Sequence, residues 1–301
     1  MIVVGAGMAG LLAGAMLRGE CSEIIERQTE IPNNHSAVLR FRSTVVADVL
    51  NIPFKEVRVM KASHPWRNPV ADAMAYSYKN TGSSSLRSIT TATGEVSTRY
   101  ISPPDLVQRM ADCVMAPIKF GMSVDSGYFK PCKPVISTIP MPILMKMLDW
   151  DIKAEFNHVS GRNIKARIDD MNAYFSLYVP QPEFPGSRIS VTGDEMIVEC
   201  PIMDEPNPAS LEQIMAFASG VIGIGADRIK EVTVHEQRYA KILPIDDTER
   251  KRFILWATEV YNIYSLGRFA TWRPGLLMDD VVNDVRVIHR LINGETNYSH
   301  K

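Results

Sequence analysis

Residues 2–10 read IVVGAGMAG, and this stretch decides the fold class. The apolar run Ile2–Val4 is typical of a buried strand, and it ends in glycines with the spacing GxGxxG before the helical stretch Leu11–Arg18. A second apolar strand at 22–27 completes a unit of strand, turn, helix and strand. In such a unit the three glycines permit a tight turn, a close approach of the backbone to a pyrophosphate, and close packing of the helix on the strand. The pattern therefore predicts a Rossmann-like dinucleotide-binding unit.

An acidic residue at the end of the second strand supports this prediction. Glu26 lies twenty-one positions after Gly5, where a carboxylate can accept hydrogen bonds from both ribose hydroxyls. A carboxylate also repels a 2′-phosphate, so NADP is not expected. The N-terminus of the helix presents free N–H groups and its positive dipole end to the phosphates. The residues expected to contact the dinucleotide at this turn are Gly5, Gly7, Met8, Ala9, Gly10, Glu26 and Arg27.

The composition is that of a globular protein, because 46% of the 301 residues are hydrophobic and 22% are charged. This balance excludes disorder, collagen and coiled coil. With 33 basic and 34 acidic side chains, the net charge of -1 provides no overall field for a polyanion, although a local basic groove stays open as an alternative. Four widely spaced cysteines are expected to be reduced core thiols of a cytoplasmic protein. No basic leader and no apolar run of roughly 18 residues is found, so no membrane partner is expected.

The rest of the chain divides between two kinds of pattern. Residues 46–95, interrupted by prolines, read as an insertion, whereas 151–240 hold alternating strand patterns and one helix at 209–219. Further helices are expected from about 103, at 247–260 and at 277–292, with strands at 134–140 and 262–269. The predicted fold class is α/β, with a Rossmann-like cofactor domain at 1–45, 96–145 and 241–301 and a second, mostly antiparallel α+β substrate domain at 46–95 and 146–240.

Two further stretches connect the N-terminal unit with a known family. Residues 135–140 read VISTIP and residues 264–272 read YSLGRFATW. Together with the GxGxxG unit they resemble the FAD-dependent amine oxidase and UDP-galactopyranose mutase superfamily, over both ends and the middle of its FAD domain. The resemblance implies a glutathione-reductase-type FAD domain and FAD as the cofactor. It also implies that a Gly-Arg after the final strand and the helix after it close the flavin site, and that Thr138, Gly267, Arg268, Met278 and Asp279 contact the cofactor.

The chemistry of that helix can be understood without the family. A flavin that accepts a hydride places negative charge on its N1–C2=O edge, and a helix N-terminus aimed there stabilises the charge. We expect this helix to start at Met278 and Asp279.

The sequence departs from the superfamily pattern in two places. The GG dipeptide that commonly follows the ribose-binding acid is absent, and residues 35–43 (HSAVLRFRS) take its place. This segment offers Arg40, Arg42 and Ser43 as candidate contacts to the flavin or the phosphates. The chain is also short for a sugar mutase and shows no match to the substrate arginines of that enzyme. A mutase-like sugar isomerase is therefore the runner-up, and a non-catalytic dinucleotide-binding module is a third alternative.

A narrower resemblance concerns the size of the chain. A compact 301-residue chain with its first Rossmann strand near Met1 is similar to the small flavoproteins that bacteriophages encode for thymine hypermodification. The resemblance implies oxidation of an amino-acid-substituted thymine, such as glycine joined through its nitrogen to the 5-methyl carbon. Oxidation of the glycine N–Cα bond and hydrolysis would release glyoxylate and leave 5-aminomethyl-uracil in DNA. The expected partner is thus a small molecule or a modified nucleotide, with DNA as one candidate, and the oligomeric state is left open.

Amine oxidation by a flavin needs orientation of the substrate more than a catalytic acid. Lys241 is a candidate to hold a water near the flavin N5 or to activate oxygen, and a solvated lysine is the alternative. For a substrate carboxylate the candidate arginine clamps are Arg40, Arg42, Arg67 and Arg273, each of which can equally form a surface ion pair. His35 lies in the loop after the ribose acid, and the predicted catalytic set is Lys241, His35 and Arg273. The aromatic candidates for stacking on a base or for the core are Trp66, Tyr76, Tyr78 and Trp272.

Overall fold

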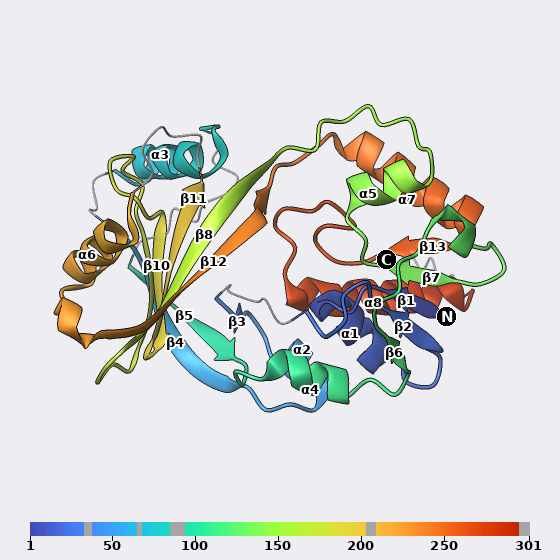
Figure 1. Cartoon of the computed structure of the whole chain (residues 1–301), viewed down its shortest axis with the longest axis horizontal. Helices are drawn as coiled ribbons and strands as arrows, with labels where there is room; N and C mark the ends of the chain where they lie inside the picture. The colour runs from blue at the N-terminus through green and yellow to red at the C-terminus, as the bar shows by residue number, and fades with distance from the viewer. Residues whose placement is uncertain (33–37, 65–67, 85–93, 203–208, 295–301) are drawn as a thin grey trace, which may run out of the picture.

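The computed structural model describes residues 1–32, 38–64, 68–84, 94–202 and 209–294. Two sheets lie side by side, a parallel sheet that includes the N-terminal strand and a larger sheet built from the middle of the chain (Figure 1). The expected α/β fold class, with a Rossmann-like domain and a second, mostly antiparallel domain, is confirmed. No helix within these ranges combines the length and the apolar character that crossing a bilayer requires.

The parallel sheet has the strand order β13-β7-β1-β2-β6. Its strands are β1 (Ile2–Val4), β2 (Glu23–Ile25), β6 (Ile118–Lys119), β7 (Val135–Ser137) and β13 (Ile263–Ser265). Along the chain, β2 and β6 are added on one side of β1, and β7 and β13 are added on the other. The order therefore reverses between β1 and β7. In open α/β sheets the crevice at the carboxyl ends of the strands beside such a reversal is where ligands bind.

Helices cover both faces of the parallel sheet, because its strands alternate apolar residues toward each face. Val3 packs into one core cluster, whereas Ile2 and Val4 pack into the other. The first cluster is completed by α1 (Met8–Met16), α2 (Val45–Leu50), α4 (Leu106–Asp112) and α8 (Met278–Ile292). The second is completed by α5 (Met141–Met147) and α7 (Asp247–Tyr261), with the 3-10 turn η2 (Ser126–Tyr128) beside it.

The larger sheet has the strand order β12-β8-β11-β10-β9-β4-β5-β3 and is antiparallel except where β4 pairs with β9. Its strands are β3 (Arg40–Phe41), β4 (Lys55–Ser63), β5 (Glu95–Ile101), β8 (His158–Ile168), β9 (Ala173–Tyr178), β10 (Arg188–Gly193), β11 (Glu195–Ile202) and β12 (Ile229–Ile242). Helix α3 (Pro69–Thr81) packs at the end of β9 and β10, where Lys79 donates hydrogen bonds to the carbonyl oxygens of Val179, Gln181 and Gly186.

The two faces of the larger sheet differ in polarity. On its outer face, alternate residues such as Ile189, Val191 and Val198 form an apolar cluster, which α6 (Leu211–Ile222) covers; the 3-10 turn η3 (Ala226–Arg228) follows α6. The intervening residues of the same strands form what we call the inner face, on the side of the parallel-sheet domain (Figure 1). Its central members are Asn163, Ser176, Tyr178, Arg188, Ser190, Thr192 and Glu199.

The sheets divide the chain somewhat differently from the predicted ranges. Strands β3 and β5, which fall in the predicted cofactor segments, pair with each other in the larger sheet, and α2, from the predicted insertion, packs on α1 and α8. Backbone pairing places β5 there, because β4 supplies its antiparallel partner. The expectation of four core thiols is wrong for Cys132, which is exposed, and holds in full only for Cys21 and Cys200.

The glycines of the first turn predict a contrast between two substitutions. A Cβ at Gly10 would lie 1.9 Å from the carbonyl oxygen of Gly5, so Gly10→Ala must push α1 away from β1. We expect this substitution to lower the free energy of unfolding by about 3 kcal/mol. A Cβ at Gly7 meets no atom within 4 Å and the φ of Gly7 is -69°, so Gly7→Ala should change that free energy by less than about 0.5 kcal/mol. Urea denaturation measures both, and equal losses would contradict this account.

Candidate functional site

The turn after β1 brings α1 onto the end of the parallel sheet. The N–H of Gly5 donates to the carbonyl oxygen of Ile25 at 2.7 Å, and Gly5 has a φ of 99°, which a side chain would strain. Beside it the hydroxyl of Thr138, at the end of β7, donates to the carbonyl oxygen of Val4 at 2.9 Å. A Cβ at Gly5 would meet that hydroxyl at 2.0 Å. Gly5, Gly10 and Thr138 thus serve the close packing of the turn.

Gly7 has a different role, because no part of the described chain fills the space beside it. It is the N-cap of α1, its backbone is extended, and no side chain caps the helix. The first turn of α1 holds no acidic residue, and a Cβ at Gly7 would meet no atom within 4 Å. Such a helix start leaves backbone N–H groups and the positive end of the helix dipole for an anion. The turn therefore fits a pyrophosphate.

Glu26 is held beside this turn at the end of β2. Its side chain is buried, and its two carboxylate oxygens accept hydrogen bonds from the N–H groups of Ala6 at 2.7 Å and Gln28 at 2.9 Å. These bonds fix the carboxylate within one residue of Gly7, at the place where a Rossmann fold binds ribose hydroxyls. The neighbouring Arg27 is exposed.

The Gly267–Arg268 pair follows β13, at the same edge of the parallel sheet. Gly267 has a φ of 90°, and a Cβ there would lie 2.9 Å from the Cβ of Ala9, so the loop touches the start of α1. The Nε of Arg268 is buried and has no hydrogen-bond partner among the residues that the structure describes. Burial lowers the pKa of Arg268, and the charge of Glu199 opposes that shift. A buried guanidinium with an unused donor fits the negative edge of a flavin.

The segment after β3 reaches the start of α8. Both the N–H and the hydroxyl of Ser43 donate to one carboxylate oxygen of Asp279, at 2.9 and 2.7 Å. The helix begins at Met278, as the sequence predicts, and the N–H of Leu277 donates to Asp280. The structure thus brings Ser43 together with Asp279, two of the predicted cofactor contacts that lie far apart in the sequence.

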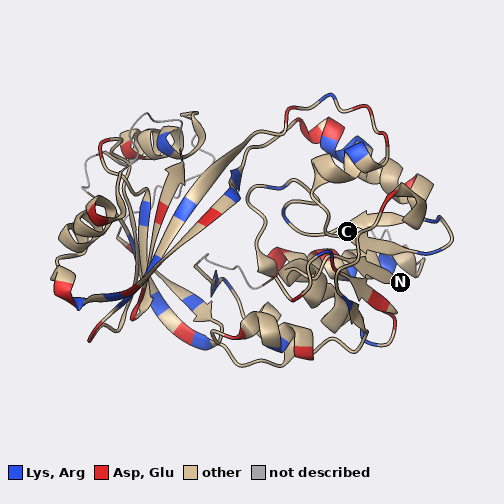
Figure 2. Ribbon diagram, in the orientation of Figure 1, with Lys and Arg blue, Asp and Glu red and all other residues tan. Residues whose placement is uncertain are grey.

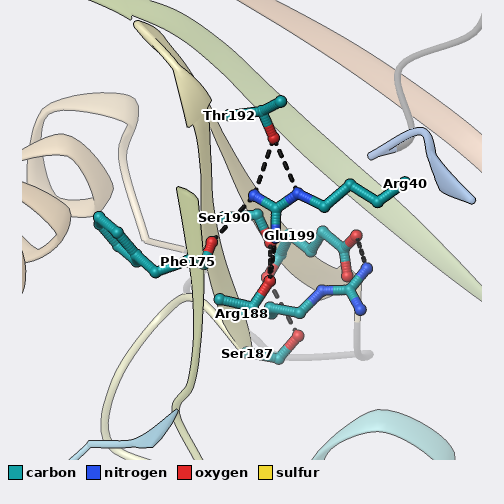
Figure 3. Close-up of polar contacts among 8 residues, drawn as sticks. Arg40, Phe175, Ser187, Arg188, Ser190, Thr192 and Glu199 are labelled. Carbon is teal, nitrogen blue, oxygen red and sulfur yellow. Dashed lines mark hydrogen bonds and ion pairs between the residues drawn. The ribbon is translucent and has the colours of Figure 1, made fainter. Parts of the chain in front are cut away.

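Arg40 lies on the inner face of the larger sheet and not at the turn after β1 (Figure 3). Its guanidinium donates to the hydroxyls of Thr192 and Ser176 and to the carbonyl oxygens of Phe175 and Val191. These bonds hold the Arg40 guanidinium against β9 and β10, away from the dinucleotide turn. They therefore argue against the predicted contact with the phosphates. The cause is the pairing of β3 with β5, which directs the side chain across the sheet. Arg42 is exposed.

Arg188 and Glu199 form an ion pair at the centre of the inner face, next to Arg40 (Figure 3). The hydroxyls of Ser176 and Ser190 hydrogen-bond each other at 2.9 Å on the same face. The Nε of Arg188 is a second buried donor without a partner in the described part of the chain. Our reading of the sequence missed Arg188. The available signal was the alternation of Arg188, Ser190 and Thr192 with apolar residues in β10, which predicts one polar and one apolar face.

Lys241 lies where the inner face meets the Gly267–Arg268 loop. It is at the end of β12, and its ammonium is 5.0 Å from the centre of the Tyr76 ring. Burial lowers the pKa of Lys241 to about 7; the charge of Glu199 opposes this shift, and the charges of Arg188 and Arg268 add to it. Lys241 is therefore close to half-charged at neutral pH, in contrast to the solvated lysine that was the alternative.

The other predicted residues lie elsewhere or outside the described ranges. Arg273 forms an ion pair with Asp284 of α8, so its guanidinium is already paired. Trp272 is buried, donates its indole N–H to Leu243 and packs on Phe156, which makes it a core residue. Tyr76 is buried under Lys241, whereas Tyr78 is exposed. His35, Trp66 and Arg67 lie outside the residues that the structure describes.

Comparison with known proteins establishes the fold. No protein-family model matches the sequence, and no curated protein matches it. The structure is similar to L-proline dehydrogenase from P. horikoshii, with a TM-score of 0.59 and 11% identity over 99% of this chain and 94% of that chain. It is similar to glycine oxidase from Geobacillus kaustophilus, with a TM-score of 0.57 and 12% identity over 100% and 95% of the two chains. It is also similar to a CLA-producing fatty acid isomerase from P. acnes, with a TM-score of 0.60 and 12% identity over 96% and 97%. At these identities the likeness is one of fold, which the chain shares over nearly its whole length with glycine oxidase and L-proline dehydrogenase.

Proposed function

We propose that the chain is an FAD-dependent oxidoreductase that oxidises a carbon–nitrogen bond of an amine. The observation that carries this proposal is the uncapped start of α1 at Gly7 beside the buried carboxylate of Glu26. The first fits the pyrophosphate of a dinucleotide, and the second fits its ribose. The unpartnered Nε of Arg268 at the same sheet edge supports a flavin, because a flavin that takes up electrons gains negative charge.

An amine substrate is supported by the residues that surround this edge and by the shared fold. Bound FAD would supply the electron sink, so the protein needs chiefly to orient the substrate and keep its nitrogen neutral. The unused Nε of Arg188, whose guanidinium also pairs with Glu199, supports a role for this residue in binding a substrate carboxylate. Lys241, with its lowered pKa, can accept a proton from the substrate ammonium at neutral pH.

The most specific form of the proposal is oxidation of thymine whose 5-methyl carbon carries glycine through its nitrogen. The glycine N–Cα bond loses two electrons and two protons and becomes a C=N double bond, with the electrons passing to the cofactor. Water then adds across the C=N bond and cleaves it, giving glyoxylate and 5-aminomethyl-uracil. The carboxylate of the substrate glycine would bind Arg188.

The purified protein provides the first test. We expect it to be yellow with bound FAD, and to be bleached without oxygen by 5-[(carboxymethyl)amino]methyl-uracil, presented as a nucleoside or in an oligonucleotide. One glyoxylate should form for each flavin reduced. The matched control is 5-aminomethyl-uracil, which lacks the glycine and should leave the flavin oxidised. A folded protein that takes up no FAD would overturn the whole proposal. Binding of a UDP-sugar only after the flavin has been reduced would favour the mutase alternative.

The position of Glu26 leads to a prediction for the affinity of the protein for FAD when the charge of this side chain is removed. Glu26→Gln removes the charge and leaves one carbonyl oxygen where two carboxylate oxygens now accept hydrogen bonds. We expect the Kd for FAD to rise about tenfold, as for the loss of one charge-assisted hydrogen bond. Glu30→Gln, at an exposed position in the loop that follows, is the control and should leave the Kd unchanged. Calorimetric titration of the apoprotein measures both, and equal effects would remove Glu26 from the ribose site.

Lys241 predicts a pH dependence. Because burial lowers the pKa of Lys241 to about 7, raising the pH through 7 converts it to the neutral amine that can accept a proton. The rate of flavin bleaching should therefore rise with an apparent pKa near 7, and Lys241→Met should abolish that step. Lys165→Met, on the same face but paired with Glu195, should keep it. Retention of the step in Lys241→Met would assign it to another group.

The lowered pKa of Lys241 also determines whether the free energy of unfolding rises or falls with pH. Between pH 7 and about 10.5, Lys241 is protonated in the unfolded chain but has released its proton in the native protein. Stability should consequently rise with pH in this window, and less so in Lys241→Met. Urea denaturation at pH 7 and pH 9.5 measures the difference.

A further inference from the structure

We propose that Tyr76 is a positioning residue for Lys241, and that the face of its ring holds the ammonium form of Lys241 in preference to the neutral amine. The proposal deepens the function proposed above, on which it rests for the role of that amine in taking a proton from the substrate. The contact between the two side chains depends on neither the cofactor nor the substrate, so it can be tested without them.

The first argument is the contact itself. The Nζ of Lys241 lies 5.0 Å from the centre of the Tyr76 ring. A cation within about 6 Å of the ring centre is attracted to the negative face of an aromatic ring, and the attraction is stronger where water is excluded. Tyr76 is only 3% exposed. A neutral amine gains no comparable attraction, so the ring stabilises the charged form of Lys241.

The second argument is that the ring is held in place. Tyr178 of β9 packs edge-on against Tyr76, with the ring centres 5.3 Å apart and an angle of 79° between the ring planes. Less than one turn further along α3, Lys79 ties the helix to the larger sheet through three backbone carbonyl oxygens. Burial raises the pKa of Tyr76, so its phenol stays neutral over the pH range in which Lys241 titrates. The ring is therefore a fixed and uncharged surface.

The third argument is that the backbone of Lys241 is fixed from the other side. The register of β12 against β8 shifts between Gln237 and Lys241, and such a bulge changes the direction of a side chain. Gly161 of β8 leaves room for this bulge, because a Cβ at Gly161 would lie 2.6 Å from the Cβ of Ala240. Beyond the bulge Lys241 pairs with Val159. The glycine thus lets β12 close onto β8 at the point where Lys241 meets Tyr76.

The ring opposes the other influences on Lys241. Burial lowers the pKa of Lys241, the charge of Glu199 opposes this shift, and the charges of Arg188 and Arg268 add to it. The Tyr76 ring acts in the same sense as Glu199, because it favours the ammonium. Its neighbour Val159 on β8 carries no charge. Tyr76 therefore keeps both protonation states of Lys241 accessible near neutral pH, as a group that takes up a proton and returns it requires.

Competitive acetylation of the full chain tests the contact. Mass spectrometry of the peptide that contains Lys241 gives the pH midpoint at which its amine becomes reactive. In Tyr76→Leu we expect this midpoint to fall by about half a pH unit or more, because the charge loses the attraction of the ring. Tyr76→Phe keeps the ring and should restore the midpoint. A midpoint in Tyr76→Leu that is unchanged or raised would overturn the proposal.

A matched control comes from a second pair of the same kind. The Nζ of Lys55 lies 5.4 Å from the centre of the Tyr174 ring, so Tyr174→Leu removes a similar contact on β9 and should leave the Lys241 midpoint unchanged. An equal fall in this variant would show a general loss of packing and contradict the role of Tyr76.

A further variant keeps the test valid if Tyr76→Leu does not fold. Pentafluorophenylalanine at position 76 preserves the shape of the ring and reverses the charge distribution on its face. It should lower the midpoint at least as far as the loss of the ring. An unchanged midpoint with this side chain would also overturn the proposal.

The pH profile of flavin bleaching separates this proposal from the function on which it rests. If both hold, the step in the profile of Tyr76→Leu should move to lower pH together with the acetylation midpoint, whereas a purely structural defect would lower the rate without moving the step. A shifted midpoint in a protein that no amine bleaches would overturn the amine oxidation and leave the contact between Tyr76 and Lys241. Bleaching by an amine with an unshifted midpoint would do the reverse.

Discussion

The close contact between α1 and the turn after β1 is the constraint on which the rest of the structure depends. With no side chain at Gly5 and Gly10, the helix can start directly against the end of the strand. This contact orients the uncapped helix start toward the carboxyl edge of the parallel sheet, where β7 and β13 also end. Thr138, Gly267 and Glu26 then surround one place, although they come from separate parts of the chain. Their arrangement follows from the sheet order and from this contact.

The two faces of the larger sheet differ: the outer face packs into an apolar core, and the inner face carries charged and polar side chains. Its outer face is closed by α6 and needs only apolar alternation. Its inner face holds half-buried charges that are hydrogen-bonded, and among the described residues Arg40 has only neutral oxygens as acceptors. Arg40, Arg188 and Lys241 therefore give this face its character. Figure 2 shows basic and acidic residues along the ribbon of both domains, so the distinction lies in their pairing and not in their presence.

Local patterns predicted most of the elements. The last two helices and the turn at Gly5–Gly10 were predicted within a few residues, because each has a strong period or a glycine signature. The strands of the larger sheet between 151 and 240 were not assigned individually, and β12 is the hardest of them to recognise because most of its residues are exposed. For the site, the structure brings Ser43 together with Asp279 and sets Gly267 against Ala9. Arg40 could not be placed, because the sequence does not reveal that β3 joins the larger sheet or that it faces β10. Alternation along β10 predicts a polar face for Arg188, but the partner Glu199 on β11 was not predicted.

The four residues from Arg40 to Ser43 connect the two domains through side-chain hydrogen bonds at both ends. Arg40 is bonded to β9 and β10 of one domain, and Ser43 is bonded through Asp279 to the first turn of α8 in the other. Two anchors this close along the chain leave almost no slack between them. A hinge opening of the two sheets would have to break one set of these bonds, so this short segment opposes such a motion.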